Sequence, residues 1–403
     1  MLAAIAKGES FIKGDLQGGD ILSTCRVLRQ LGAEISWRED GIKVKGWGGR
    51  GLLPCLEPLD CGNSATCMRT LAGLLAFSGH TYTLTGDASL LTRPMERVVD
   101  TLGQIGVKVV FSEKGTAPLV VYGRDHPSFS EVEVILNVAS AQLKTSLMWA
   151  LLLCPDVSVK IVEPLLSRDH SEILARHLQA KVIEEVDSLH RHIIKFSGIS
   201  NFSGFVYDVK GDLSSAAFLV TLAILKEGKN VFIENVNLNP TRLGFYHILQ
   251  RMGAKISLDV KGQSWGESFG TITTEYSRLR ATDVLPKEVP LCLDELPLLA
   301  LVASQAEGVT RVYGARELRF KESDRLSCTL RELGKLGVKS CEYADGFAIE
   351  GPCKLKGGYL QSYGDHRLSM TWGVASALSD CLIDIEGKDC CEVSFPRFWE
   401  WII

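Results

Sequence analysis

The chain has 403 residues, of which 46% are hydrophobic and 23% charged, a composition typical of a globular protein. A chain of this length rarely folds around one core, so we expect two domains. The net charge of −4 excludes an overall basic field for nucleic acid, and a bound anion would need a local cluster of cations. Apolar stretches such as residues 147–154 are far shorter than the ~18 residues of a membrane helix.

The first residues contain neither the basic segment nor the long apolar core of a signal peptide. The twelve cysteines form no C-x-x-C pair, and no Cys/His spacing is that of a zinc site. Cysteines scattered over a chain of this size are typical of the reducing cytosol. We therefore expect a cytoplasmic protein without a metal ion.

A short pattern recurs along the chain: an apolar helix end, a glycine and the start of a strand. It occurs at Gly32, Gly106, Gly253 and Gly337, and a weaker copy without glycine occupies residues 177–182. The glycine suits the left-handed position that follows many helices. The copies are about 74 residues apart, or about 84 before the last one, which indicates internal duplication.

Six such units divide naturally into three plus three. A break at residues 211–215 precedes an apolar helix at 216–225, so we expect a first domain of residues 1–209 and a second of residues 210–403. Residues 395–403 resemble a helix that has not yet reached its glycine. We therefore expect the first and the last of the six units to be incomplete.

Clusters of small, polar and charged residues stand at the expected starts of helices. In chain order they are residues 60–69, Arg93-Pro94-Met95, residues 140–145, residues 167–172, residues 293–297, residues 317–325 and residues 364–367. Each cluster alone is ambiguous, because a glycine loop, a helix cap or a surface helix with salt bridges has a similar sequence. Asn239-Pro240-Thr241-Arg242 is interpreted mainly as a turn and cap.

Together the clusters indicate a site for anions. They place cations and two acids at the starts of elements: Arg93, Arg168, Lys321, Arg325, Arg367, Asp294 and Glu322. Arginine and lysine bind phosphate and carboxylate oxygens, and a carboxylate that enters an apolar run suits proton transfer. There is no Walker loop, no G-x-G-x-x-G and no metal cluster. We expect acid–base catalysis with charge stabilisation, and no metal or organic cofactor.

In this order the clusters resemble those of the EPSP synthase (3-phosphoshikimate 1-carboxyvinyltransferase) family over almost the whole chain. The resemblance rests on Gly62-Asn63-Ser64-Ala65-Thr66 with Arg69, Arg93-Pro94-Met95, Ser140-Ala141-Gln142, Arg168-Asp169-His170, Gly211-Asp212-x-Ser214-Ser215-Ala216, Asn239-Pro240-Thr241-Arg242, Asp294-Glu295-x-Pro297, Leu318-Arg319-x-Lys321-Glu322-Ser323-Asp324-Arg325 and Asp365-His366-Arg367. It implies an α/β (α+β) fold of two similar domains, each built from three βαβαββ repeats. The active site would lie in a cleft between the domains that closes on the substrates.

The resemblance also implies the reaction and its residues. The enolpyruvyl group of phosphoenolpyruvate is transferred to the 5-hydroxyl of shikimate 3-phosphate, with release of phosphate. Asp294 would accept the proton of the hydroxyl, and Glu322 would protonate the methylene carbon and later deprotonate it. Shikimate 3-phosphate would be bound by Ser140, Ala141, Gln142, Arg168, Asp294 and Lys321. Phosphoenolpyruvate would be bound by Ala65, Arg93, Gln142, Arg325 and Arg367. The enzyme would be a cytoplasmic monomer of aromatic amino acid biosynthesis, with no partner in nucleic acid or membrane.

Two features depart from the family pattern. The family begins with a segment like P-G-[SD]-K-S-x-S-x-R, and Met1 of this chain aligns just after it. We therefore expect the chain to fold largely but to turn over poorly or not at all. Ala65 stands where most of the family has glycine, as in its glyphosate-insensitive branch.

Three other functions compete with this interpretation. A UDP-N-acetylglucosamine enolpyruvyl transferase shares the fold and phosphoenolpyruvate, but residues 321–325 and 168–170 argue against it. An inactive form that only binds ligand agrees with the missing first segment. An RNA-terminal-phosphate enzyme would need a basic groove, which the net charge disfavours.

Overall fold

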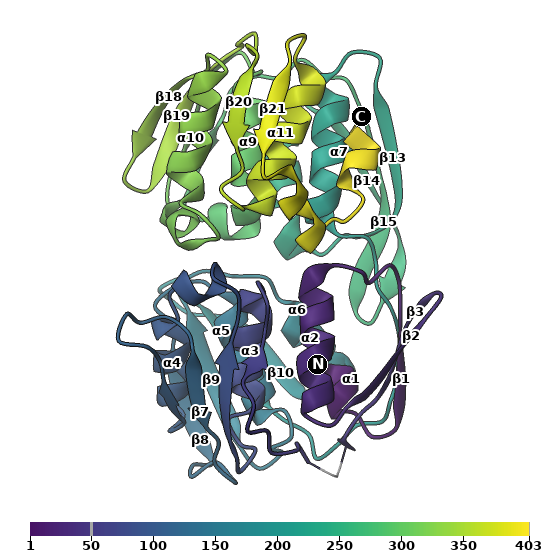
Figure 1. Ribbon diagram of the computed structural model, residues 1–403, viewed down its shortest axis with the longest axis vertical. Helices are drawn as coiled ribbons and strands as arrows, with labels where there is room; N and C mark the ends of the chain where they lie inside the picture. The colour runs from purple at the N-terminus through teal and green to yellow at the C-terminus, as the bar shows by residue number, and fades with distance from the viewer. Residues whose placement is uncertain (49–50, 403) are drawn as a thin grey trace. The chain divides into compact units, whose positions relative to one another are not determined.

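The computed structural model describes residues 1–48 and 51–402, and the chain divides into two compact units, Met1–Val209 and Lys210–Ile403. Figure 1 colours the first unit from purple to teal and the second from teal to yellow. In the described part of the chain each unit contains three β-sheets with helices, which confirms the mixed α/β class expected from the sequence. None of the described helices has the length and apolar character required to cross a membrane.

The first unit has three four-stranded sheets with one shared topology. Each sheet has one parallel pair of strands followed by two antiparallel pairs. The strands, in sheet order, are β12 (Val206–Asp208), β1 (Glu9–Lys13), β3 (Gly41–Lys45) and β2 (Glu34–Arg38); β4 (Leu59–Asp60), β5 (Thr81–Thr85), β7 (Leu119–Tyr122) and β6 (Lys108–Val110); β8 (Glu131–Ile135), β9 (Ser158–Glu163), β11 (His192–Ser197) and β10 (Lys181–Val186).

Helices alternate with these strands in the expected βαβαββ order. The helices of the first unit are α1 (Leu2–Ile5), α2 (Gly19–Gln30), α3 (Ala65–Leu74), the short η2 (Leu90–Thr92), α4 (Glu96–Gly103), α5 (Ala141–Leu151) and α6 (His170–His177). The second sheet therefore follows the order β4-α3-β5-α4-β6-β7, and the third follows β8-α5-β9-α6-β10-β11. In the first sheet β12, the last strand of the unit, takes the first position, with Val206 opposite Phe11 of β1.

The second unit has one complete copy of the same sheet and two smaller sheets. Its strands, in sheet order, are β16 (Asp283–Val284), β17 (Gly308–Val312), β19 (Gly346–Gly351) and β18 (Lys339–Tyr343); β13 (Asn230–Asn237), β15 (Glu267–Glu275) and β14 (Lys255–Ser264); β20 (Gly358–Gln361) and β21 (Ile383–Glu386). Beside β13, a parallel bridge between Gly211 and Val236 takes the position of a first strand.

The helices of the second unit follow the same order. They are α7 (Leu213–Leu225), η3 (Pro240–Arg242), α8 (Gly244–Arg251), η4 (Val289–Leu291), η5 (Leu293–Glu295), α9 (Leu296–Ala303), η6 (Arg316–Phe320), α10 (Arg325–Lys335), α11 (His366–Leu378), η7 (Lys388–Val393) and α12 (Phe398–Ile402). The helix expected at residues 395–403 is α12, and Ile403 lies outside the described residues.

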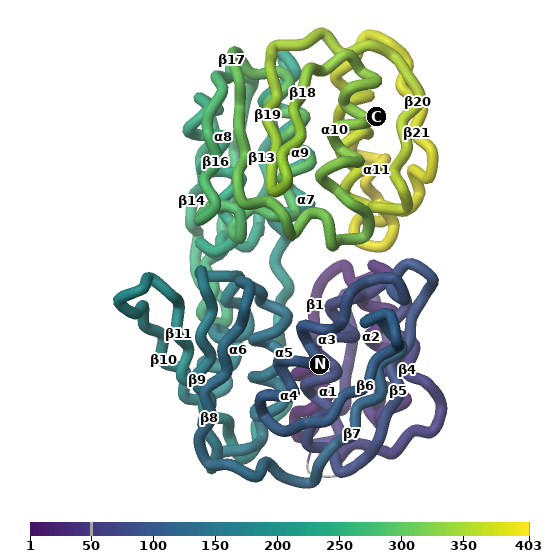
Figure 2. Tube along the Cα trace, turned by 90° about the vertical axis from the view of Figure 1, so that its left-hand side faces the viewer, coloured from purple at the N-terminus to yellow at the C-terminus, as the bar shows by residue number. Residues whose placement is uncertain are grey.

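The first helices of the repeats, α3, α5, α7, α9 and α11, are largely buried, whereas second helices such as α4, α8 and α10 are amphipathic. In α5 every residue from Leu143 to Leu151 is buried, and α9 is buried along its whole length. Figures 1 and 2 both show α3 beside α5, and α7, α9 and α11 packed together within the second unit. In α10, by contrast, the buried leucines Leu326, Leu330 and Leu333 form one face. Each buried leucine contributes about 1.5–3 kcal/mol, so the central helices are fixed in place.

Recurring glycines end the second helix of four repeats, and Gln179 ends it in a fifth. The residues Gly32, Gly106, Gly253 and Gly337 have φ between +74° and +103°, and Gln179 adopts φ +73° at the matching position of the third repeat. In all five, the residue donates its N–H to the carbonyl three residues before it, and the next N–H donates to the carbonyl five residues before it. The glycine-less copy therefore makes the same turn, with a glutamine in a conformation that favours glycine.

Replacing Gln179 with glycine should raise the free energy of unfolding by about 0.5–1 kcal/mol, because the left-handed conformation is strained for a residue with a Cβ. The matched variant is Gly253→Ala, whose Cβ would meet only Arg278 O at an ordinary 3.5 Å. It should lower the same quantity by about 1 kcal/mol. Equilibrium urea unfolding measures both, and a loss of stability in Gln179→Gly would contradict this account.

Candidate active site

The candidate residues stand at the starts of helices in both units. Three sheets contain a parallel pair of strands that are each followed by a helix: β4 and β5, β8 and β9, and β16 and β17. Because parallel strands end at the same edge of a sheet, the two helices begin at that edge. A helix start presents N–H groups without intrahelical partners and the positive end of the helix dipole. These edges therefore suit anionic ligands.

The loop before α3 is fixed by its own side chains. Asp60 Oδ1 accepts a hydrogen bond from the N–H of Gly62 (2.8 Å), and Ser64 Oγ caps α3 by accepting the N–H three residues further on (3.2 Å). Gly62 has φ +59°, which favours glycine. Ala65 is the first residue of α3 and is 8% exposed, so its methyl group lies at the helix start.

Arg93 joins the start of α4 to this loop. Its side chain is buried, and Nη2 donates to Asn63 Oδ1 (2.6 Å) and to Ser89 Oγ (3.3 Å). Asn63 in turn donates from Nδ2 to Asp87 Oδ2 (2.7 Å). Arg93 and the loop that carries Ala65 are thus held by one chain of hydrogen bonds.

Gln142 joins the start of α5 to the first turn of α3. Its Oε1 accepts from Arg69 Nη1 (2.7 Å), and its Nε2 donates to Thr66 Oγ1 (2.8 Å). Ser140 is the N-cap of α5 but makes no side-chain capping hydrogen bond, and Ala141 is the first helical residue. The hydroxyl of Ser140 is therefore not used as a cap.

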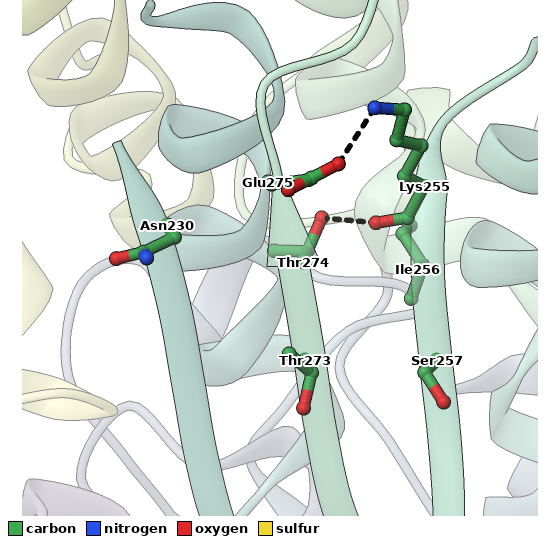
Figure 3. Close-up of a pocket in the computed structure, with 7 residues that line it drawn as sticks. All are labelled: Asn230, Lys255, Ile256, Ser257, Thr273, Thr274 and Glu275. Carbon is green, nitrogen blue, oxygen red and sulfur yellow. Dashed lines mark hydrogen bonds and ion pairs between the residues drawn. The ribbon is translucent and has the colours of Figure 1, made fainter. Parts of the chain in front are cut away.

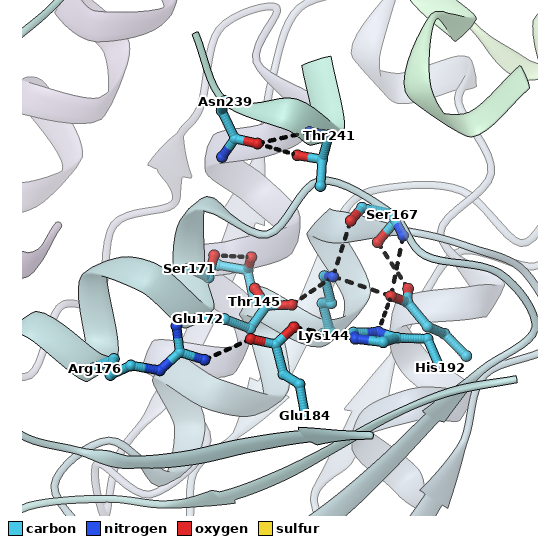
Figure 4. A network of polar contacts seen from close by, with 11 residues as sticks. Lys144, Thr145, Ser167, Ser171, Glu172, Arg176, Glu184, His192, Asn239 and Thr241 are labelled. Atoms are coloured by element: carbon cyan, nitrogen blue, oxygen red, sulfur yellow. Dashed lines mark hydrogen bonds and ion pairs between the residues drawn. The ribbon is translucent and has the colours of Figure 1, made fainter. Parts of the chain in front are cut away.

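Arg168 lies between β9 and α6, directly after a firmly anchored serine. Ser167 donates its N–H to Glu163 Oε1 (3.1 Å) and its hydroxyl to Glu163 Oε2 (2.7 Å). The carbonyl of Ser167 accepts from Lys144 Nζ (3.3 Å), and Lys144 also pairs with Glu163 and Glu172. Figure 4 shows these groups converging on the ammonium group of Lys144.

In the second unit, Arg325 at the start of α10 is a buried guanidinium shared by three carboxylates. Its Nε and Nη2 donate to the two oxygens of Asp365 (2.8 and 3.1 Å), Nη2 also to Glu322 Oε2 (2.6 Å), and Nη1 to Asp294 Oδ1 (3.3 Å). Burial lowers the pKa of Arg325, but Asp365, Glu322 and Asp294 together raise it above its usual value. The starts of α9, α10 and α11 therefore meet at one cation.

The three carboxylates differ in their access to solvent. The side chain of Asp365 is fully buried, whereas those of Asp294 and Glu322 are each 16% exposed. Lys321 Nζ lies 3.2 Å from Asp294 Oδ1. Asp365 therefore fixes Arg325, and the other two carboxylates lie where a ligand can reach them.

The start of α11 adds Arg367 and His366. Asp365 caps this helix by accepting the N–H of Arg367 (2.9 Å). The Nε of Arg367 is buried and has no hydrogen-bond partner among the described residues. Burial and the charges of Arg367 and Arg325 lower the pKa of His366 to about 4, so this imidazole is neutral near pH 7.

A second set of contacts joins the starts of α7, α8 and α9. Arg242 Nη2 donates to Asp212 Oδ1 (2.7 Å) and to Ser214 Oγ (2.6 Å), and Ser214 donates to Glu295. Asn239 caps η3, as the sequence predicted for this turn. Burial raises the pKa of Asp212, but Arg242 and Arg367 lower it overall well below its usual value.

A surface depression of about 410 Å³ lies elsewhere, at one end of the sheet formed by β13, β15 and β14 (Figure 3). Its lining residues are Asn230, Lys255, Ile256, Ser257, Thr273, Thr274 and Glu275. Lys255 and Glu275 pair across it at 2.6 Å and are both exposed. The depression contains none of the candidate residues, so its size gives no argument for function.

Several residues of these networks were assigned no substrate-binding or catalytic role from the sequence. They are Asn63, Arg69, Lys144, Asp212, Arg242 and Asp365. All six lie at or near a helix start within a motif or cluster, and Asp212 and Asp365 occupy N-cap positions. Their position in a motif was the only sequence signal of their importance. Their hydrogen-bond partners could not be predicted, because these lie up to 73 residues away in sequence, as for Arg69 and Gln142.

Comparisons with known proteins identify one family over nearly the whole chain. The family model of EPSP synthase (3-phosphoshikimate 1-carboxyvinyltransferase) matches residues 1–402. The 3-phosphoshikimate 1-carboxyvinyltransferase of Syntrophomonas wolfei is 39% identical over 405 residues, which cover 99% of this chain and 92% of that protein. The protein of the same name from Coxiella burnetii is 38% identical over 402 residues, which cover 99% of this chain and 90% of that protein.

Solved structures show the same relationship. EPSP synthase from Acinetobacter baumannii is 34% identical and superposes with a TM-score of 0.83, over 100% of this chain and 91% of that one. The enolpyruvyl transferase NikO from Streptomyces tendae, at 16% identity and a TM-score of 0.73 over 99% of this chain and 89% of that one, shares the fold. With a family match over nearly its whole length and relatives well above 30% identity, this chain belongs to the EPSP synthase family.

Proposed function

We propose that this chain is a 3-phosphoshikimate 1-carboxyvinyltransferase of the shikimate pathway. It would transfer the enolpyruvyl group of phosphoenolpyruvate to the 5-hydroxyl of shikimate 3-phosphate and release phosphate. The observation that carries the proposal is the set of charged helix starts in a chain of this family, above all the partly exposed pair Asp294 and Glu322 beside Lys321 and Arg325. Such a set matches two substrates that carry phosphate and carboxylate groups.

Asp294 and Glu322 act as the proton-transfer groups in this proposal. Asp294 accepts the proton of the 5-hydroxyl, and Glu322 protonates the methylene carbon and later removes a proton from it. Both carboxylates are partly exposed and both contact Arg325, which compensates their charge. Asp365 is fully buried and serves to hold Arg325.

Arg93, Arg325 and Arg367 bind phosphoenolpyruvate, with Ala65 and Gln142 nearby. The buried Nε of Arg367 supports this role, because an anionic ligand would supply the hydrogen-bond acceptor that the described residues do not. The phosphate released in the reaction leaves as an anion, and these guanidinium groups stabilise the charge as it develops.

Ser140, Ala141, Gln142 and Arg168 bind shikimate 3-phosphate, together with Asp294 and Lys321. Ser140 has its hydroxyl unused as a cap, and Ala141 offers an N–H at the start of α5. Arg168 adds a cation at the start of α6. A phosphate group is the ligand that a serine, helix-start N–H groups and an arginine together recognise.

The oligomeric state and the cellular compartment of the protein are also part of the proposal. We infer a monomer that acts in the cytoplasm on small molecules and has no nucleic-acid partner. The net charge of −4 supports the absence of a nucleic-acid partner, and the scattered cysteines, all free, support the cytoplasmic setting. Size-exclusion chromatography with light scattering tests the monomer, and a dimer mass would refute it.

Release of phosphate from phosphoenolpyruvate and shikimate 3-phosphate tests the function directly. Asp294→Asn and Glu322→Gln should each lower kcat by about 10²–10⁴-fold, because each removes a group that moves a proton in the transition state. The control is Glu350→Gln, which removes an exposed carboxylate paired with Lys339 at 3.7 Å and should leave kcat unchanged. If Asp294→Asn or Glu322→Gln turned over within about threefold of the parent, the substituted residue would have no part in proton transfer.

Asp365→Asn separates structural from chemical roles. It breaks the bidentate pair with buried Arg325 and should lower the melting temperature as well as the rate. Asp294→Asn should lower the rate with little change in melting temperature. If Asp294→Asn were destabilised as strongly as Asp365→Asn, the assignment of Asp294 as a proton acceptor would lose its support.

Ala65 should make the enzyme poorly sensitive to glyphosate. Its methyl group stands at the buried start of α3, where a glycine would leave more room for an inhibitor longer than phosphoenolpyruvate. One extra methyl group in a tight site costs roughly 1–3 kcal/mol, so Ala65→Gly should lower the inhibition constant by about one to two decades. Equal inhibition constants for the two forms, at similar KM for phosphoenolpyruvate, would refute the assignment.

A further inference from the structure

A buried ionic network lies directly behind the residues proposed for shikimate 3-phosphate. Its centre is Lys144, one turn after Ala141 in α5, with Nζ 3.1 Å from Glu163 Oε1 and in contact with Glu172. All three side chains have no exposed surface. His192 extends the network from Glu163 (2.9 Å) to Glu184 (3.1 Å), as Figure 4 shows.

Burying a lysine here needs full compensation. The charge of an unpaired ammonium group would cost several kcal/mol in the interior, and the two carboxylates and one carbonyl that surround it offset that cost. A methionine or leucine would fill the same volume without such a cost, and the rest of α5 from Leu143 to Leu151 is almost entirely apolar. The lysine therefore supplies directed contacts, which an apolar side chain could not make.

These contacts are directed at the segment that carries Arg168. Lys144 Nζ donates to the carbonyl of Ser167, the residue just before Arg168. Glu163, held by Lys144, accepts both the N–H and the hydroxyl of Ser167. Glu172 lies in α6, which begins two residues after Arg168. One ammonium group thus joins α5, the end of β9 and the start of α6.

We propose that Lys144 is a positioning residue for phosphate binding. It holds the Ser167–Arg168 segment against the first turn of α5, so that Arg168 and the Ser140–Gln142 helix start can engage the same phosphate group. The assignment of that phosphate to shikimate 3-phosphate rests on the proposed function. The clamp itself rests on the contacts of Lys144, Glu163 and Ser167.

The charge of His192 is part of the same network and predicts a pH dependence of stability. Burial and the nearby charge of Lys144 lower the pKa of His192, but its hydrogen bonds to Glu163 and Glu184 raise it overall to about 9. Glu184 also forms a salt bridge with Arg176. Because the folded pKa lies above the usual 6.5, the stabilisation is complete below pH 6.5 and is lost as the pH rises through 9. The unfolding constant should rise by roughly a hundredfold across that window, and His192→Gln should abolish the rise. A parent protein with no such rise would contradict the protonated His192.

Hydrogen exchange tests the clamp without any ligand. The Ser167 amide, which donates to Glu163, should exchange at least about tenfold faster in Lys144→Met than in the parent, because its acceptor is no longer held. Leu147→Ala is the matched control: it opens a cavity on the same buried helix but leaves every polar side chain of the network in place. If Lys144→Met left Ser167 as protected as in Leu147→Ala, the clamp would be refuted.

Binding then distinguishes a clamp from simple stabilisation. The double variant Lys144→Met/Glu172→Gln removes one carboxylate with the lysine, so most of the lost stability should return. If Lys144 positions the site, the dissociation constant for shikimate 3-phosphate, measured calorimetrically, stays about 10–100-fold raised in the double variant, while Lys144→Arg recovers part of it. If affinity returned together with stability, Lys144 would be structural only. A parent that failed to bind shikimate 3-phosphate would refute the proposed function, while the exchange experiment would still judge the clamp.

Discussion

The burial of Arg325 is the constraint on which the second unit is organised. A guanidinium with 2% of its side chain exposed needs carboxylates around it, and these come from the starts of three helices: Asp294 before α9, Glu322 before α10 and Asp365 before α11. α9 and α10 follow the parallel strands β16 and β17 of one sheet and therefore begin at one edge, whereas α11 follows β20 of another sheet. The ion pairs then fix their relative positions, and leave Asp294 and Glu322 partly open to a ligand.

The first unit solves the same problem with a different cation. Lys144 is buried within α5 and compensated by Glu163 and Glu172, whereas Arg93 and Arg69 use neutral acceptors, Asn63 and Gln142. Carboxylates thus adjoin Arg325 of the second unit and Lys144 of the first, whereas the side-chain amides of Asn63 and Gln142 adjoin Arg93 and Arg69.

The sequence predicted the repeat because its signal is local. The helix end followed by a left-handed residue recurs at Gly32, Gly106, Gly253 and Gly337, and even Gln179 keeps the hydrogen bonds of this turn. The partners of the charged residues were not predictable in the same way. Residues 317–325 were consistent with a surface segment held by salt bridges or with part of a functional site, and they contain both. Arg319 forms salt bridges with Asp324 and Glu342, whereas Arg325 contacts carboxylates at the starts of other helices. Local pattern does not distinguish these two arginines, because their difference is the tertiary contact.

The central claim is that this chain adds the 5-hydroxyl of shikimate 3-phosphate to C2 of phosphoenolpyruvate while a proton adds to the methylene carbon. Phosphate is then expelled from C2 as a proton leaves the methylene carbon. The most direct measurement is the reaction of the purified chain with phosphoenolpyruvate and shikimate 3-phosphate in deuterated water, followed by mass spectrometry of the product. If Glu322 exchanges protons with solvent and acts at the methylene carbon, the enolpyruvyl product carries deuterium there. A product that carries no deuterium at the methylene carbon would contradict the assigned chemistry.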